Sequence, residues 1–216
     1  MNGSVFRDRA DAGRRLAEAL RSRAFDRPVV LALPRGGLPV ADEVARALGA
    51  ELDVLLVRKI GHPEQPELAL GAVGEGGILT LNEDLAGLVP RDRIDAIARR
   101  ERAEIARRAS VYRAVRPRAD LRGRDAIIID DGAATGATVR AAIAVARAAG
   151  AGRVTVALPV APAQTVRDLG HEADGVVCLS APESFGAVGL FYDEFGQVPD
   201  DEALAILRAT AQRAGP

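Results

Sequence analysis

Two adjacent carboxylates, Asp130 and Asp131, stand at the end of an apolar run and precede a loop of small residues. The run, residues 126–129, contains three consecutive isoleucines, which is typical of a strand buried on both faces. The loop, residues 132–136, consists of Gly, Ala and Thr, and a helical pattern begins at about Ala137. Small side chains leave backbone N–H groups accessible, and the N-terminal end of a helix attracts anions. The sequence therefore predicts a phosphate-binding loop with two acids beside it.

Cationic residues follow two other predicted strands. The first strand, residues 28–33, runs into PRGG at 34–37, and the second, residues 52–57, runs into RKIG at 58–61. Ligands of open parallel sheets bind beyond the carboxyl ends of the strands, so we expect these cations and the two acids to meet at one edge. This combination fits a ligand with a terminal phosphate, neighbouring hydroxyls and a second, strongly anionic group.

Lys59 is the single lysine among the 29 basic residues of the chain. A chain so biased toward arginine keeps a lysine where a compact ammonium group is required. The alternative, survival of one lysine by chance, stays open at this point.

Composition limits the class of protein. The 216 residues suit one α/β domain, and a net charge of −1 gives no general attraction to nucleic acids or membranes. Cys178 is the only cysteine, which excludes a disulfide framework or zinc cluster within one chain. No apolar run approaches the ~18 residues of a membrane span, and the first residues do not resemble a signal peptide. We therefore expect a cytoplasmic protein without membrane contact.

Strands alternate with helices along the chain, which predicts an α/β fold with a mostly parallel sheet covered on both faces. The pattern predicts one domain over residues 1–216, with a core at about 28–180 and a cover helix at 7–23. Glycines interrupt the β-like residues 71–81, which favours a hairpin or flap. The remaining predicted elements are helices at 39–48, 91–112, 137–149, 163–169 and 199–211 and strands at 154–160 and 175–179.

Other functional motifs are absent from the sequence. It contains neither G-x-G-x-x-G after the first strand nor G-x-x-x-x-G-K-[ST], and its two histidines are too few for a histidine-rich metal site. The Arg-rich stretch at 91–118 could bind RNA, but acids interleave with its arginines, which favours a solvated or dimer-facing helix. We expect a homodimer that does not bind nucleic acid.

Residues 127–138, IIIDDGAATGAT, resemble the phosphoribosyl-diphosphate (PRPP) motif of type I phosphoribosyltransferases. In the same comparison, PRGG is similar to the family's pyrophosphate loop, Arg58-Lys59 to the cationic end of the second strand, and residues 61–77 to its mobile catalytic flap. The resemblance covers about residues 28–179 and extends to a group of bacterial predicted phosphoribosyltransferases. It implies the type I phosphoribosyltransferase fold with a flap and a C-terminal hood at about 181–216.

The resemblance also implies a role for each matching residue. Asp130 and Asp131 would hold the ribose hydroxyls directly or through Mg²⁺, the expected cofactor. The 5-phosphate would bind to Ala133, Ala134, Thr135, Gly136, Ala137 and Thr138. Pyrophosphate would contact Arg35, Gly36, Gly37, Arg58 and Lys59, with a cis peptide turning an N–H toward it. Asp130, Asp131, Lys59 and Arg35 are therefore the expected catalytic residues.

Two positions depart from the family pattern. Gly132 replaces a usually apolar residue, which we expect to loosen the turn. Ala134 stands where hypoxanthine-type enzymes carry an acid, which argues against a 6-oxopurine acceptor and is closer to the adenine type. An acid or base must then come from elsewhere, and the flap offers Glu64, Glu67 and Glu75.

The acceptor site of this family is built by the hood, which in this chain is rich in aromatic residues. Phe185, Phe191 and Tyr192 could stack on a planar base, or could instead fill a small core. The resemblance thus implies transfer of ribose 5-phosphate from PRPP to a nitrogenous, purine-like base. The alternatives are a PRPP or nucleotide sensor without catalysis on the same fold, and an RNA-binding regulator that uses residues 91–118.

Overall fold

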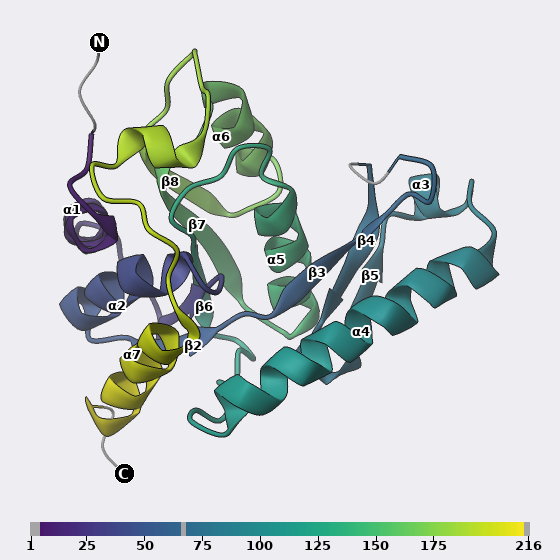
Figure 1. The fold of residues 1–216 in the computed structure, drawn as a ribbon, viewed down its shortest axis with the longest axis horizontal. Coiled ribbons are helices and arrows are strands. Elements are labelled where there is room, and N and C mark those ends of the chain that lie inside the picture. Colours follow the sequence, from purple (N-terminus) through teal and green to yellow (C-terminus); the bar gives the residue numbers. More distant parts are fainter. Residues whose placement is uncertain (1–4, 66–67, 214–216) are drawn as a thin grey trace.

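A computed structural model describes residues 5–65 and 68–213 and contains two sheets (Figure 1). The larger sheet is parallel, with five strands in the order β2-β1-β6-β7-β8. Its strands are β1 (Val29–Ala32), β2 (Glu51–Val54), β6 (Asp125–Ile129), β7 (Arg153–Val160) and β8 (Gly175–Ser180). The predicted α/β class with a mostly parallel sheet is therefore confirmed.

The two central strands, β1 and β6, are buried on both faces, as their apolar runs predict. Val30 and Ile127 pack into the core beneath α1 (Arg9–Arg21) and α2 (Gly37–Leu48). Leu31 and Ile128 pack on the opposite face, beneath α5 (Ala137–Ala148). Alternate residues of each strand thus pack into two separate cores. This packing holds β1 and β6 in place, and the functional residues follow directly after these strands.

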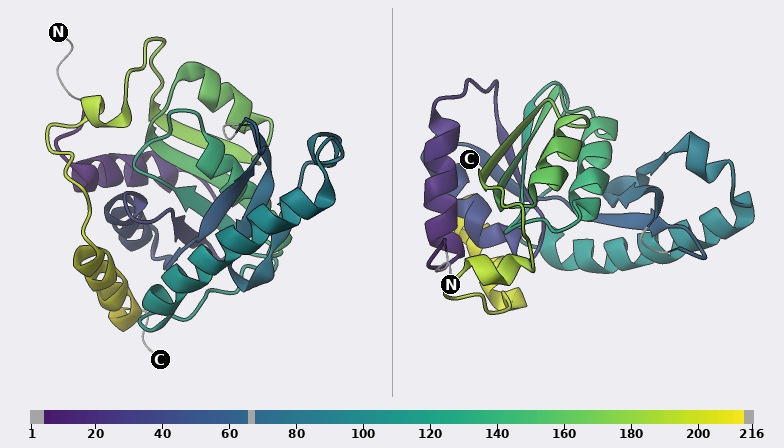
Figure 2. Two further views of the ribbon diagram at one scale, coloured as in Figure 1. Left: turned by 45° about the vertical axis from the view of Figure 1, so that its right-hand side comes forward. Right: turned by 90° about the horizontal axis from the view of Figure 1, so that it is seen from above.

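Helices cover both faces of the parallel sheet (Figure 2). The predicted cover helix is confirmed as α1, which packs against α2, while α5 and α6 (Ala163–Gly170) cover the other face. The C-terminal helix α7 (Asp200–Arg213) packs against α2 and β2 through the buried residues Ala203 and Leu207. The predicted hood is therefore divided: residues 181–199, which include the short helix η2 (Val188–Phe191), form a loop region, and α7 belongs to the helical layer.

The second sheet is antiparallel and contains β3 (Val57–Gly61), β4 (Ala69–Gly74) and β5 (Leu79–Leu81). It packs between α5 and the long helix α4 (Arg91–Arg113), and the short helices η1 (Glu75–Gly77) and α3 (Glu83–Ala86) flank β5. The hairpin predicted at 71–81 is confirmed. Within the described ranges, no helix combines the length and apolarity that crossing a membrane requires.

The prediction that Arg58 and Lys59 end the second strand is wrong. The strand β2 stops at Val54, and the buried residues Leu55 and Leu56 carry the chain into β3 of the other sheet. The chain stays buried where it passes from one sheet to the other, so its sequence stays apolar. Its hydrogen-bonding partner nevertheless changes from β1 to β4. The two cations therefore lie within the antiparallel sheet.

Candidate active site

Asp130 and Asp131 follow β6 directly, at the carboxyl edge of the parallel sheet. The backbone N–H of Asp131 donates to Oδ1 of Asp130 at 2.9 Å. Arg9, from α1, donates through Nε to Oδ2 of Asp131 at 2.8 Å, and the Tyr192 hydroxyl donates to the Asp131 carbonyl at 2.6 Å. The second acid is thus held at its side chain and at its backbone by residues remote in the sequence.

Burial raises the pKa of both carboxyls in this acid pair. Desolvation and the negative charge of Asp131 raise the pKa of Asp130 well above its ordinary value. Desolvation also raises the pKa of Asp131, and the Arg9 guanidinium opposes that shift. Two carboxylates beside one guanidinium leave a negative charge that a bound cation would stabilise.

The oxygens of the acid pair suit a Mg²⁺ ion that takes its other ligands from water and from a substrate. Carboxylate oxygens are hard donors, and Mg²⁺ characteristically keeps several ligands from water and substrate phosphates. Among the described residues, no group of three or more His, Cys, Asp or Glu side chains is placed to hold a metal. Asp130 and Asp131 could therefore supply the protein's share of such a site and not a complete cage.

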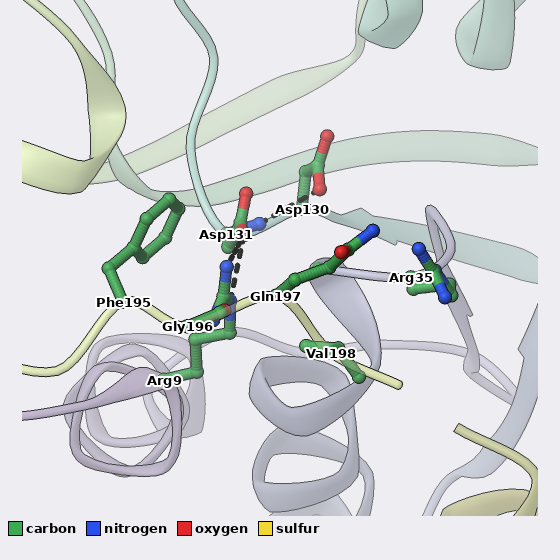
Figure 3. Close-up of a pocket in the computed structure, with 9 residues that line it drawn as sticks. Arg9, Arg35, Asp130, Asp131, Phe195, Gly196, Gln197 and Val198 are labelled. Carbon is green, nitrogen blue, oxygen red and sulfur yellow. Dashed lines mark hydrogen bonds and ion pairs between the residues drawn. The ribbon is translucent and has the colours of Figure 1, made fainter. Parts of the chain in front are cut away.

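A pocket of about 440 Å³ lies against the acid pair and is called here the acid pocket (Figure 3). The guanidinium of Arg9 lies 3.9 Å from the centroid of the Phe195 ring, and its NH1 donates to the Gly196 carbonyl at 2.7 Å. The pocket is lined by Arg9, Arg35, Gly36, Asp130, Asp131, Phe195, Gly196, Gln197 and Val198. The N-terminal helix and the C-terminal loop thus meet over the acids.

The PRGG loop approaches the acid pair through its backbone. A Cβ on Gly36 would lie 2.2 Å from Oδ2 of Asp131, and one on Gly37 would lie 2.6 Å from the Ile129 carbonyl oxygen. Both positions therefore require glycine. The Pro34–Arg35 peptide is cis, as the resemblance implies. Helix α2 begins at Gly37, two residues before the predicted start.

A second pocket, of about 840 Å³, contains the predicted phosphate-binding loop and is called here the phosphate pocket. Thr135, Ala137 and Thr138 line one side of it, and Arg58 and Lys59 line another. Gly136 precedes α5 with a left-handed φ of 73°, a conformation that favours glycine. The structure thus brings both predicted cations to the predicted loop, although the cations belong to the antiparallel sheet and the loop follows the parallel one.

The other predicted loop residues support this geometry. Ala133 and Gly136 are buried, and the carbonyl of the exposed Ala134 accepts the Thr165 hydroxyl at 2.8 Å. The expectation that Gly132 loosens the turn is wrong. A Cβ there would lie 2.6 Å from Cγ1 of Val188 and 3.0 Å from Cγ1 of Val160, so close packing replaces the missing side chain.

Helix α4 contributes to the phosphate pocket, which its sequence pattern did not reveal. Glu101 is buried and accepts from Nε of Arg58 at 2.8 Å and from NH2 of Arg100 at 2.8 Å. Arg100, Glu101 and Arg108 all line the pocket. The interpretation of this helix as merely solvated or dimer-facing is therefore incomplete, because one face of it closes the site.

The three flap acids occupy different surroundings. Glu64 is exposed beside the phosphate pocket, where its backbone N–H donates to Nδ1 of His62 at 3.2 Å, and Glu67 lies outside the described residues. Glu75 is held by Arg113 at 2.7 Å. His62 itself lines the phosphate pocket. The sequence pattern did not indicate this histidine as a residue of the pocket.

Arg113 ties Glu75 to the buried Asp53 of β2, so Arg113→Met is expected to destabilise the fold by about 3 kcal/mol. Arg113 lies 2.6 Å from Asp53, whose pKa is raised by burial and held down by this guanidinium. Without Arg113, the folded protein would hold the Asp53 proton more tightly still. Stability should then fall as the pH rises through that raised pKa, so the loss of stability should be larger at pH 8 than at pH 5.

Urea denaturation of Arg113→Met at both pH values measures this loss of stability. The exposed Arg107→Met is the control, and an equal loss at both pH values would contradict the assignment.

The hood aromatics pack mainly against one another. Tyr192 is buried, lies 5.3 Å from the Phe6 ring centroid and uses its hydroxyl on Asp131, so the expectation that it stacks on a substrate base is not supported. Phe185 and Phe191 stack on each other at 5.3 Å, beside the same small cluster. Phe195 is the aromatic residue that lines the acid pocket. Tyr192 therefore belongs to a small core, and Phe185 and Phe191 are partly buried against it.

Comparison with known proteins identifies the family of this chain. The family model described as the phosphoribosyl transferase domain matches residues 5–194. Two Mycobacterium tuberculosis proteins, named "Putative phosphoribosyl transferase Rv0571c" (strain H37Rv) and "Putative phosphoribosyl transferase MT0597" (strain CDC 1551), are each 51% identical over 94% of this chain. The chain spans 46% of the length of these relatives. It belongs to the phosphoribosyl transferase family, which is a family of transferase enzymes.

A solved structure is also similar in sequence and in fold. The crystal structure of TT1426 from Thermus thermophilus superimposes with a TM-score of 0.91 and 51% identity, over 94% of this chain and 98% of that one. The similarity therefore extends over nearly the whole chain and well beyond the short motifs. The predicted family and fold are both confirmed.

Proposed function

We propose that this protein transfers ribose 5-phosphate from PRPP to a nitrogenous base and releases pyrophosphate, with Mg²⁺ as cofactor. The observation that carries the proposal is the pairing of Asp130 and Asp131 with an open loop at the start of α5. Arg35 lies beside the acids, and Arg58 and Lys59 lie across the phosphate pocket. The loop therefore has the two acids and Arg35 near one end and two further cations across the phosphate pocket.

The charges of the site match those of the proposed reaction. The bond from the anomeric carbon to the pyrophosphate oxygen breaks, and a bond to a nitrogen of the base forms. Positive charge develops on the ribose and negative charge on the departing pyrophosphate, so carboxylates belong at the first and cations at the second. When bound, Mg²⁺ would neutralise the phosphate oxygens of the leaving group.

Each residue has a role in this proposal. Asp130 and Asp131 orient the ribose hydroxyls, and Thr135 and Thr138 with the loop backbone bind the 5-phosphate. Lys59 and Arg35 receive the pyrophosphate together with the backbone of Gly36. His62 and Glu64 are the described flap residues available for proton transfer, and Phe195 and Gln197 are the acid-pocket side chains available to the acceptor.

Pyrophosphate release from PRPP, measured with a panel of free purine and pyrimidine bases, tests the proposal. We expect release with at least one base, loss of release on chelation by EDTA, and recovery on addition of Mg²⁺. If the protein binds PRPP but does not consume it with any of the added bases, the alternative of a sensor would be favoured. The absence of both binding and release would contradict the proposal. The expected homodimer and cytoplasmic location stay predictions.

A further inference from the structure

A pocket of about 520 Å³ lies at the opposite end of α2 from the acid pair and is called here the arginine pocket. Three arginines line it: Arg46 from the last turn of α2, Arg213 from the last turn of α7, and Arg116 from the segment after α4. The 12 residues of α2 give a helix of about 18 Å, so this pocket is separate from the acid pocket.

The carboxylates near the arginine pocket are already shared between arginines. Asp42, which is buried, accepts from both Arg46 and Arg213. Glu51 accepts from Arg116 at 2.8 Å and, through its other oxygen, from Arg124 at 2.7 Å. Each of these two carboxylates is therefore already hydrogen-bonded to two arginines.

The side chains of the arginine pocket carry slightly more positive than negative charge. The three arginines line it together with the carboxylate of Glu51, and the buried Asp42 pairs with Arg46 and Arg213. Three guanidinium groups and two carboxylates leave a charge of +1. The C-terminal ends of α2 and α7 each contribute about half a negative charge. The guanidinium donors, and not a large net charge, would therefore recognise an anion.

Arg116 supplies an independent indication of a missing acceptor. The residue is 8% exposed, and its Nε has no hydrogen-bond partner within the described part of the chain. A buried, charged donor without an acceptor is costly, so such groups usually have a partner. Arg116 also lines the pocket, so a ligand bound there would lie beside its guanidinium group.

We propose that the arginine pocket is a second, non-catalytic binding site for a phosphate monoester such as a nucleotide or sugar phosphate. Guanidinium groups match phosphate oxygens with paired N–H donors, and three of them converge here from separate elements. The volume exceeds that of a bare phosphate group and accommodates the organic part of such a ligand. The inference does not depend on the reaction proposed for the acid pair.

Isothermal titration of the full chain with AMP and with ribose 5-phosphate tests this site. The variant Arg46→Gln/Arg213→Gln removes two partly exposed cations, and Arg21→Gln/Arg91→Gln removes two exposed cations elsewhere as the matched control. We expect wild type and control to bind at least one of the two probes with the same affinity. The arginine-pocket variant should bind at least tenfold more weakly at one site, with any binding in the phosphate pocket retained.

Thermal unfolding provides a second measurement that separates binding from folding. The probe that binds should raise the Tm of the wild type and the control more than that of the arginine-pocket variant, whatever the variant's own Tm. Adenosine, which lacks the phosphate, should not bind this site. Equal binding of a probe to variant and wild type, equal binding of adenosine, or no binding of either phosphate monoester would overturn the proposal.

Discussion

Asp131→Asn is expected to reduce pyrophosphate release from PRPP by about 10²–10³-fold, the usual cost of removing one group that stabilises transition-state charge. The substitution keeps the shape of the side chain and an oxygen that can accept from Arg9, but it removes the charge. The substitution also removes the ion pair between Asp131 and Arg9, and the lower desolvation cost of a neutral amide offsets part of that loss. We therefore expect the free energy of unfolding to fall by about 1–2 kcal/mol, with the protein still folded and the main effect in turnover.

The matched control for Asp131→Asn is Asp26→Asn, which makes the same change at an acid whose side chain is 76% exposed. We expect this control to retain wild-type release within a factor of two. Steady-state rates and thermal unfolding, measured on the same preparations, separate the two effects. Unchanged release by a folded Asp131→Asn protein would refute the assignment of the acid pair.

Lys59→Ala should lower pyrophosphate release by about 10²-fold or more, because a cation facing the leaving group would be lost. Lys59 is half-buried in β3 and lines the phosphate pocket with Thr135 and Thr138. Lys59→Arg keeps the charge and replaces a compact ammonium with a broad, planar group. If the chain retains this lysine for its shape, the arginine variant should recover less than a tenth of the lost activity.

The control for the lysine variants is Arg93→Ala, which removes an exposed cation of α4 away from the pocket. It should leave the rate of release unchanged. Full activity in Lys59→Arg would show that any cation suffices, and full activity in Lys59→Ala would remove this residue from the mechanism. Inhibition by added pyrophosphate should weaken in parallel with the rate if Lys59 contacts the leaving group.

The parts of the site that are contiguous in the chain could be predicted from sequence. Residues 126–138 combine a buried strand, two acids, an open loop and a helix start, and each of these has a local pattern. The hairpin at 71–81 and the helix at 91–112 follow from the same kind of signal. These elements occur in the structure with boundaries shifted by three residues at most.

The parts that depend on distant contacts could not be predicted in this way. Arg9 and Asp131 are separated by 122 positions, and the amphipathic pattern of α1 shows only which face is buried. The crossing at Leu55 and Leu56 was hidden because an apolar run does not reveal its pairing partner. Tyr192 and Phe195 carry similar aromatic signals in the sequence, yet Tyr192 lies in the core and Phe195 lines the acid pocket.

Calorimetric titration of PRPP in the presence of Mg²⁺ tests the central claim most directly, because it needs no knowledge of the acceptor base. The account predicts that the wild-type protein binds PRPP, that chelation by EDTA weakens this binding, and that Asp130→Asn/Asp131→Asn binds at least a hundredfold more weakly while folded. Failure of the wild-type protein to bind PRPP, or equal binding by the double variant, would contradict the account.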